Sequence, residues 1–200
     1  MKDLVALVAD GTMRSVLNNL LARDKAFGIR KIQIEIFVHP HHDPGVYNDA
    51  GSFLSPFTIN YKYALVLFDR EGCGQENKSS IELQSIVQKQ VNIHGWEHRS
   101  GVIVLDPELE SWVWTRSHHV SRVLDIEKQE LLELLQGDDP NCQKPSHPKE
   151  LMEKILQRSR IPRSSALYED LAKSVSFKRC SDPSFQQLKH NLIEWFGIKL

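Results

Sequence analysis

The stretch Tyr63 to Asp69 (YALVLFD) places an aspartate directly after six consecutive hydrophobic residues. A short, continuous apolar run of this kind is typical of a strand that is buried on both faces, as in a parallel sheet. Similar runs at Leu4 to Val8 (LVALV) and Val102 to Leu105 (VIVL) are also followed closely by an aspartate. Lys31 to Val38 (KIQIEIFV) instead alternates isoleucine with polar residues, which predicts a strand with one wetter face, nearer an edge of the sheet.

Helical patterns lie between these strands. Apolar residues recur at helical spacing after Thr12 and again after Ser79 or Ser80, and these residues are suitable helix caps. A further helix is expected to start at Glu108, because Pro107 suits the first position of a helix. Residues 39–45 (HPHHDPG) indicate a loop with a turn signal. Strands that alternate with helices imply βαβ units, so the predicted fold class is α/β, with a mostly parallel sheet flanked by helices.

The character of the sequence changes near residue 125, after which no strand pattern occurs. We therefore predict an α/β core in residues 1–124 and a helical C-terminal part in residues 125–200 that packs on the core. A chain of 200 residues is long enough to bury a full core without disulfides. Four amphipathic segments predict the C-terminal helices: residues 126–135, 149–157, 164–175 and 183–196.

The bulk composition excludes several classes of protein. The net charge of −1 gives no global field toward nucleic acid, so any such binding needs a local basic patch. Three widely spaced cysteines argue against a disulfide framework and against a cysteine-based zinc site. The N-terminus lacks a signal-peptide pattern, and no apolar run approaches the roughly 20 residues needed to cross a bilayer. We therefore expect a cytoplasmic protein with no membrane contact.

Carboxylates gather where the predicted strands end. Asp10 follows the first strand, Asp69 and Glu71 follow the third, and Glu108 and Glu110 follow the fourth. Open parallel sheets bind ligands outside the carboxyl ends of their strands. Converging carboxylates are costly unless protons or a cation neutralise them, and hard oxygen ligands favour magnesium, manganese or calcium. The sequence therefore predicts a divalent metal site at this edge of the sheet.

Each of these acids also has a purely structural reading. Asp10 can cap a helix, and glutamates at a helix start suit the macrodipole. Glu108 and Glu110 do not share a helix face at their spacing, so we expect Glu108, nearer the strand end, to serve the site. Glu110 is a possible addition, as are His39 and Asp43 after the second strand. The histidines of that loop suit a transition metal, but a surface or substrate-contacting loop is the alternative.

Basic residues in the C-terminal part offer a local route to nucleic acid. They could surround a phosphate backbone, or they could form ordinary solvated helix faces. No Walker, GxGxxG or GxSxG pattern occurs, so a nucleotide-cradling loop of those kinds is not supported. The basic residues are Lys144, Lys149, Lys154, Arg158, Arg160, Arg163, Lys173, Lys178 and Arg179.

The layout of the acids resembles the TOPRIM arrangement of topoisomerases, primases and OLD-type nucleases, in which acids bind magnesium for phosphoryl transfer on nucleic acid. Further segments look like those of small bacterial TOPRIM-like proteins of methylation-associated defence systems, and this resemblance covers nearly the whole chain. These segments are residues 69–74 (DREGCG), 107–112 (PELESW), 144–145 (KP), 148–150 (PKE) and 162–165 (PRSS).

The resemblance implies a component of a bacterial anti-phage defence system that cleaves nucleic acid phosphodiesters with Mg²⁺ or Mn²⁺. Asp69 and Glu71 would hold the metal with help from Glu108, and Asp10 would orient or deprotonate the attacking water. DNA and other defence-system proteins would be its partners.

The sequence departs from the TOPRIM arrangement at two positions. Asp10, or Ala9 in a shifted register, stands in place of a longer glutamate, and Glu71 stands in place of a second aspartate. Two alternatives therefore stay open. One is a non-catalytic scaffold or regulatory subunit of the same system with a degenerate site, and the other is a small phosphohydrolase.

Overall fold

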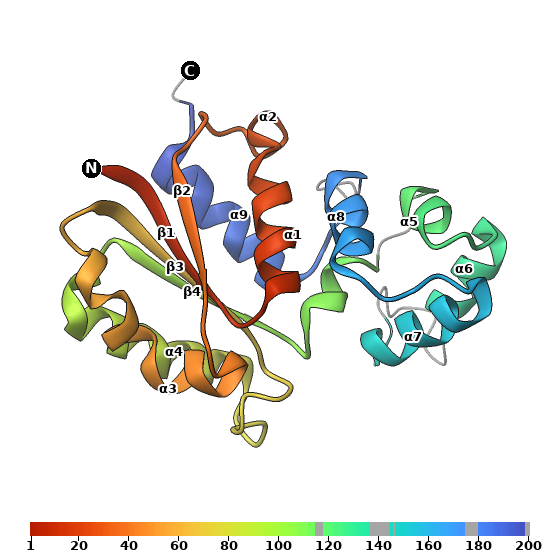
Figure 1. Ribbon diagram of the computed structural model, residues 1–200, viewed down its shortest axis with the longest axis horizontal. Helices are drawn as coiled ribbons and strands as arrows, with labels where there is room; N and C mark the ends of the chain where they lie inside the picture. The colour runs from red at the N-terminus through yellow and green to blue at the C-terminus, as the bar shows by residue number, and fades with distance from the viewer. Residues whose placement is uncertain (115–117, 137–144, 146, 175–179, 199–200) are drawn as a thin grey trace.

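The computed structural model describes residues 1–114, 118–136, 145, 147–174 and 180–198. Its centre is a four-stranded parallel sheet with the strand order β2-β1-β3-β4 (Figure 1). The predicted α/β class, with a parallel sheet flanked by helices, is confirmed. The strands are β1 (Lys2–Val8), β2 (Ile34–Val38), β3 (Tyr61–Asp69) and β4 (Ser100–Leu105).

Helices cover both faces of the sheet (Figure 1). This double cover buries the first strand completely, because no residue from Leu4 to Val8 has exposed surface. The predicted edge position of β2 is confirmed, but the strand is half-buried along its whole length rather than on alternate residues. One face carries α1 (Gly11–Leu21), α2 (Asp24–Phe27) and α9 (Pro183–Phe196), and the other carries α3 (His42–Leu54) and α4 (Ser80–Val91).

Side-chain caps mark the start of three of these helices, including α9, whose cap is Asp182. The cap of α1 is Asp10, whose Oδ1 accepts a hydrogen bond of 2.7 Å from the backbone N of Met13, so the prediction of Thr12 as the cap was wrong. The predicted cap Ser79 is confirmed for α4, where it forms a reciprocal capping box with Glu82. A π-type turn, η2 (Asn92–Trp96), follows α4.

Two sequence predictions beside the strand ends were wrong. The loop predicted at residues 39–45 is shorter, because α3 begins at His42 and the turn signal Asp43-Pro44-Gly45 forms its first turn. Proline is compatible with that position, since its missing N–H would have no partner there. Glu108 does not open an α-helix, because a short 3₁₀ helix, η3 (Leu109–Trp112), follows it.

The C-terminal part is helical, and its predicted helices are confirmed in the part of the chain that the structure describes. Helices α5 (His118–Val123), α6 (Lys128–Gln136) and α7 (Pro148–Ser159) lie beside α8 (Ser165–Ser174), away from the sheet (Figure 1). Helix α8 contributes to two hydrophobic clusters: Tyr168 and Ala172 belong to the cluster of the sheet, and Leu167 and Leu171 belong to the cluster of the C-terminal helices. The four predicted segments form α6, α7, α8 and α9, whereas α5 precedes residue 125 and was not predicted as a separate helix.

None of the helices in the described ranges combines the length and the apolar character needed to cross a membrane.

Candidate functional site

The chain reverses its winding direction between β1 and β3. From β1 the chain passes through α1, on one face of the sheet, to β2 at one edge. From β3 it passes through α4, on the opposite face, to β4 at the other edge. Ligands of open α/β sheets bind at such a switch point, outside the carboxyl ends of the strands. Val8 of β1 pairs with Leu67 of β3, so Asp10 and Asp69 follow at the same level of the two strands.

Asp69, the last residue of β3, is the centre of the site. Its Oδ1 is buried and accepts no hydrogen bond from any described residue. Burial raises the pKa of Asp69 well above its ordinary value, and the neighbouring carboxylates of Asp43, Glu110, Asp10 and Glu108 raise it further. A buried polar atom without a partner costs about 1–3 kcal/mol, so this oxygen points to a ligand.

Two more aspartates reach the site from the ends of β1 and β2. Asp43, in the first turn of α3, accepts a 2.7 Å hydrogen bond at Oδ1 from the backbone N of Asp69. Burial raises the pKa of Asp43, and the charge of Asp10 raises it further. Asp10 uses Oδ1 for its helix cap. Asp10 and Asp43 therefore each use one oxygen for a backbone hydrogen bond.

The two glutamates after β4 are buried and held by residues of the C-terminal part. Glu108 is 6% exposed and accepts a 3.0 Å hydrogen bond at Oε1 from the backbone N of Lys149, whose Nζ lies 3.6 Å from Oε2. Burial and the charge of Glu110 raise the pKa of Glu108. Glu110 is 3% exposed and accepts at Oε1 from the hydroxyl of Tyr168 (2.5 Å) and from Nη2 of Arg163 (2.7 Å).

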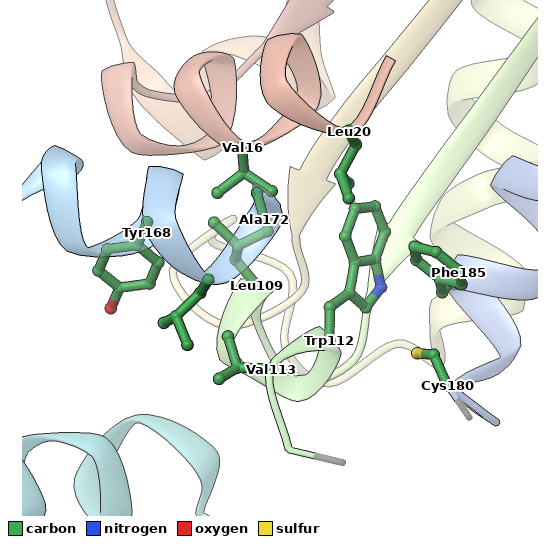
Figure 2. Close-up of a pocket in the computed structure, with 10 residues that line it drawn as sticks. Val16, Leu20, Leu109, Trp112, Val113, Tyr168, Ala172, Cys180 and Phe185 are labelled. Carbon is green, nitrogen blue, oxygen red and sulfur yellow. The ribbon is translucent and has the colours of Figure 1, made fainter. Parts of the chain in front are cut away.

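The ring of Tyr168 lines a small apolar pocket between α1, η3, α8 and α9. Figure 2 shows that the hydroxyl of Tyr168 points away from Trp112 and Phe185, which lie across the pocket. Burial, followed by the neighbouring Glu110, raises the pKa of Tyr168 above its ordinary value. The hydroxyl is therefore neutral and donates to the carboxylate.

Glu71 and His39 lie apart from this cluster. Glu71 is exposed on the loop after β3, where its backbone N donates to the carbonyl of Pro107 at 2.9 Å. His39 is buried, which lowers its pKa, and its Nδ1 accepts a 3.1 Å hydrogen bond from the backbone N of His41. The ring of His39 also packs on Phe53, with 5.4 Å between centroids, as a core histidine does.

The donor set at the switch point suits a hard divalent cation in its chemistry, because it consists of carboxylate oxygens and includes the unpartnered Oδ1 of Asp69. Within the described ranges, no three His, Cys, Asp or Glu side chains are placed as a ready metal-binding group. Binding would therefore require the carboxylates around Asp69 to turn toward the ion.

Of the six predicted basic residues that the structure describes, four are engaged in ion pairs. Lys149 pairs with Glu108, and Arg163 with Glu110 and Glu153. Lys154 and Arg160 are exposed, and no ion pair joins them to another described residue. Arg158 pairs with Glu130, and Lys173 pairs with Glu169 and Asp170. The remaining three, Lys144, Lys178 and Arg179, lie outside the described residues.

Sequence reasoning undervalued two acids of the site and missed a partner of one of them. Asp43 was only a possible addition because its surroundings indicated a turn, and Glu110 was only a possible addition because Glu108 lies nearer the strand end. Tyr168 was missed, because no local pattern connects it to Glu110, which lies 58 positions away. Arg163, which bonds both Glu110 and Tyr168, was noticed in the sequence, but it was assigned to a basic patch.

No protein-family model and no curated protein matches the chain. Among solved structures, the chain is similar to the C-terminal region of the OLD protein of Xanthomonas campestris pv. campestris. The similarity covers 96% of this chain and 94% of that chain, with a TM-score of 0.49 and 13% sequence identity. A likeness at this level carries no argument about function.

Proposed function

We propose that the carboxyl end of the sheet binds Mg²⁺ or Mn²⁺, and that the protein cleaves nucleic acid phosphodiesters as a component of a bacterial anti-phage defence system. The observation that carries the metal site is the buried, unpartnered Oδ1 of Asp69 among other carboxylates at the switch point. The resemblance to TOPRIM-like defence proteins supports the choice of phosphodiesters as substrate.

The residues have distinct proposed roles. Asp69 would hold the cation with Asp43 and with the glutamates after β4, and Glu71 would have to turn toward it from the exposed loop after β3. The cation would supply a Lewis acid that stabilises charge on the scissile phosphate and on the leaving oxygen. Asp10 keeps Oδ2 for the attacking water, because only its Oδ1 is used by the helix cap. Its short side chain is held at the end of β1 by that cap.

A cleavage assay tests the proposal. Single-stranded and duplex DNA and a small phosphate ester are incubated with the protein in Mg²⁺ and in Mn²⁺. We expect DNA cleavage that Asp69→Asn lowers at least about 100-fold, in the range of losses seen when a transition-state-stabilising group is removed. The matched control is Asp106→Asn, because Asp106 is an exposed acid after β4 that pairs with Arg70. Turnover of the small ester alone would identify a phosphohydrolase instead.

A non-catalytic role in the same system is the second candidate. It is favoured by the ion pairs of Glu108 and Glu110 with the C-terminal part and by the exposed position of Glu71. In that case the acidic pocket binds metal and the protein forms complexes without turnover. Saturable Mn²⁺ binding together with the absence of cleavage of any of the three substrates would support this candidate.

A further inference from the structure

Glu110 is held differently from the other carboxylates of the site. Tyr168 and Arg163 both donate to its Oε1, and no described residue donates to its Oε2. The side chain is therefore fixed at one oxygen while the other stays available. Backbone N–H groups of α1 and β3 hold Asp10 and Asp43, whereas side chains from the C-terminal part hold Glu110.

The two donors form a connected unit. Nε of Arg163 donates to the hydroxyl oxygen of Tyr168 at 3.1 Å, and its guanidinium lies 5.8 Å from the centre of that ring. The hydroxyl directs its own proton to Glu110, so each donor has a defined direction. Nη1 of Arg163 also bonds Glu153 of α7 at 3.1 Å, which fixes the guanidinium from its far side.

Packing immobilises Tyr168 as well. Its side chain is 1% exposed, and its ring belongs to the hydrophobic cluster of the sheet, where it faces the apolar pocket of Figure 2. A tyrosine locked in this way sets the position of its hydroxyl to within a narrow range. The position of Glu110 is therefore determined by the core itself rather than by a flexible surface contact.

Glu110 lies in the neighbourhood of Asp69, the central residue of the site. Glu110 lies close enough to Asp69 to raise the pKa of that carboxyl more than Asp10 does. The register of the sheet agrees with this, because Asp69 pairs with Leu105 of β4 and η3, which carries Glu110, begins four residues beyond Leu105. A purely structural staple between η3 and α8 has no need of this proximity, which places two carboxylates together in the interior at an electrostatic cost.

We infer that Tyr168 and Arg163 are positioning residues that hold Glu110 by Oε1 so that its Oε2 joins Asp69 in binding the divalent cation. This inference rests on the proposed metal site. Hydrogen-bond partners of metal-binding carboxylates orient them, and their loss typically weakens metal affinity about 10–100-fold. The C-terminal part would then complete the metal site through α8.

Tyr168→Phe tests the inference because it removes one hydroxyl and changes neither charge nor ring. Isothermal titration of Mn²⁺ is expected to show an affinity at least about 10-fold weaker than that of the wild type. The matched control is Tyr61→Phe, since the hydroxyl of Tyr61 also donates to a glutamate, Glu35, but at the amino end of β3. The control is expected to bind like the wild type.

A second variant shows whether the effect runs through Glu110. Glu110→Gln is expected to weaken Mn²⁺ binding, and adding Tyr168→Phe to it should cause no further loss. Thermal melts in EDTA verify that each variant folds, and Arg163→Lys replaces Tyr168→Phe if the latter does not. Wild-type protein that fails to bind Mn²⁺ would refute the proposed metal site. Two results would overturn the inference while leaving the metal site in place. In the first, the wild type binds Mn²⁺ and Tyr168→Phe leaves the affinity unchanged or increases it. In the second, Tyr168→Phe weakens binding by the same factor in the Glu110→Gln variant as in the wild type.

Discussion

Replacing Asp69 with asparagine is expected to stabilise the metal-free protein at pH 8, although most substitutions at buried positions destabilise. The buried Oδ1 of Asp69 has no partner among the described residues, and burial together with four neighbouring carboxylates raises the pKa of this side chain. Asparagine removes the charge, and its amide can donate to the carboxylates of Asp43, Asp10 or Glu110. The substitution should therefore relieve both the repulsion and the unmet hydrogen bond.

The size of the effect follows from the missing hydrogen bond. Satisfying a buried polar atom is worth about 1–3 kcal/mol, which corresponds to a rise in Tm of about 2–12 °C for a chain of this length. The pH dependence has a definite sign. Because the folded protein holds the proton of Asp69 more tightly than the unfolded chain, the wild type loses stability as pH rises from the ordinary pKa of 3.8 toward the raised folded pKa. The asparagine of the variant does not titrate, so the advantage of the variant should grow with pH over that window.

Urea denaturation in EDTA at several pH values between 5 and 8 provides the assay. Asp106→Asn is the control, because it loses only a surface ion pair with Arg70 and should change the free energy of unfolding by about 0.5 kcal/mol or less. A variant Asp69→Asn that is less stable than the wild type by about 1 kcal/mol or more at pH 8, a typical destabilisation for a point substitution, would contradict this prediction. The carboxylate would then stabilise the fold by itself.

Three further predictions concern the elements that carry the site, and urea denaturation measures each of them. Gly45→Ala should destabilise by about 1–3 kcal/mol, because its Cβ would lie 2.0 Å from Nδ1 of His39, and an unchanged midpoint would contradict this packing. Ser79→Ala should cost about 1 kcal/mol by removing the cap of α4, whereas a neutral result would mean that Glu82 alone suffices. Leu65→Ala should cost about 2–5 kcal/mol, since β3 is buried on both faces, and a loss below that range would contradict this burial.

The strands were predictable from the sequence because both central strands are buried on both faces. Such burial leaves an uninterrupted apolar run, which is visible without a structure. Helix α3 was harder to place, because its buried face begins with Gly45 and continues through Val46, Ala50 and Leu54. Its first turn also contains residues that favour turns elsewhere. The error hid the position of Asp43, which is set by that first turn.

The acids at the strand ends were predictable in part. Asp10 and Asp69 follow from the rule that ligands bind at the carboxyl ends of parallel strands. Glu71 was placed with Asp69 on the assumption that the extended segment continues, but β3 ends at Asp69 and a turn follows. The pairing of Glu110 with Tyr168 depends on how α8 packs against η3. Contacts between segments so far apart leave no periodic pattern in the sequence.

Isothermal titration of Mn²⁺ into metal-free wild-type protein and into Asp69→Asn tests the proposed metal site most directly. We expect saturable binding to the wild type and an affinity at least about 10-fold weaker in the variant, because the variant lacks the central ligand. Absence of wild-type binding, or equal binding by both proteins, would contradict a metal site at the carboxyl end of β3.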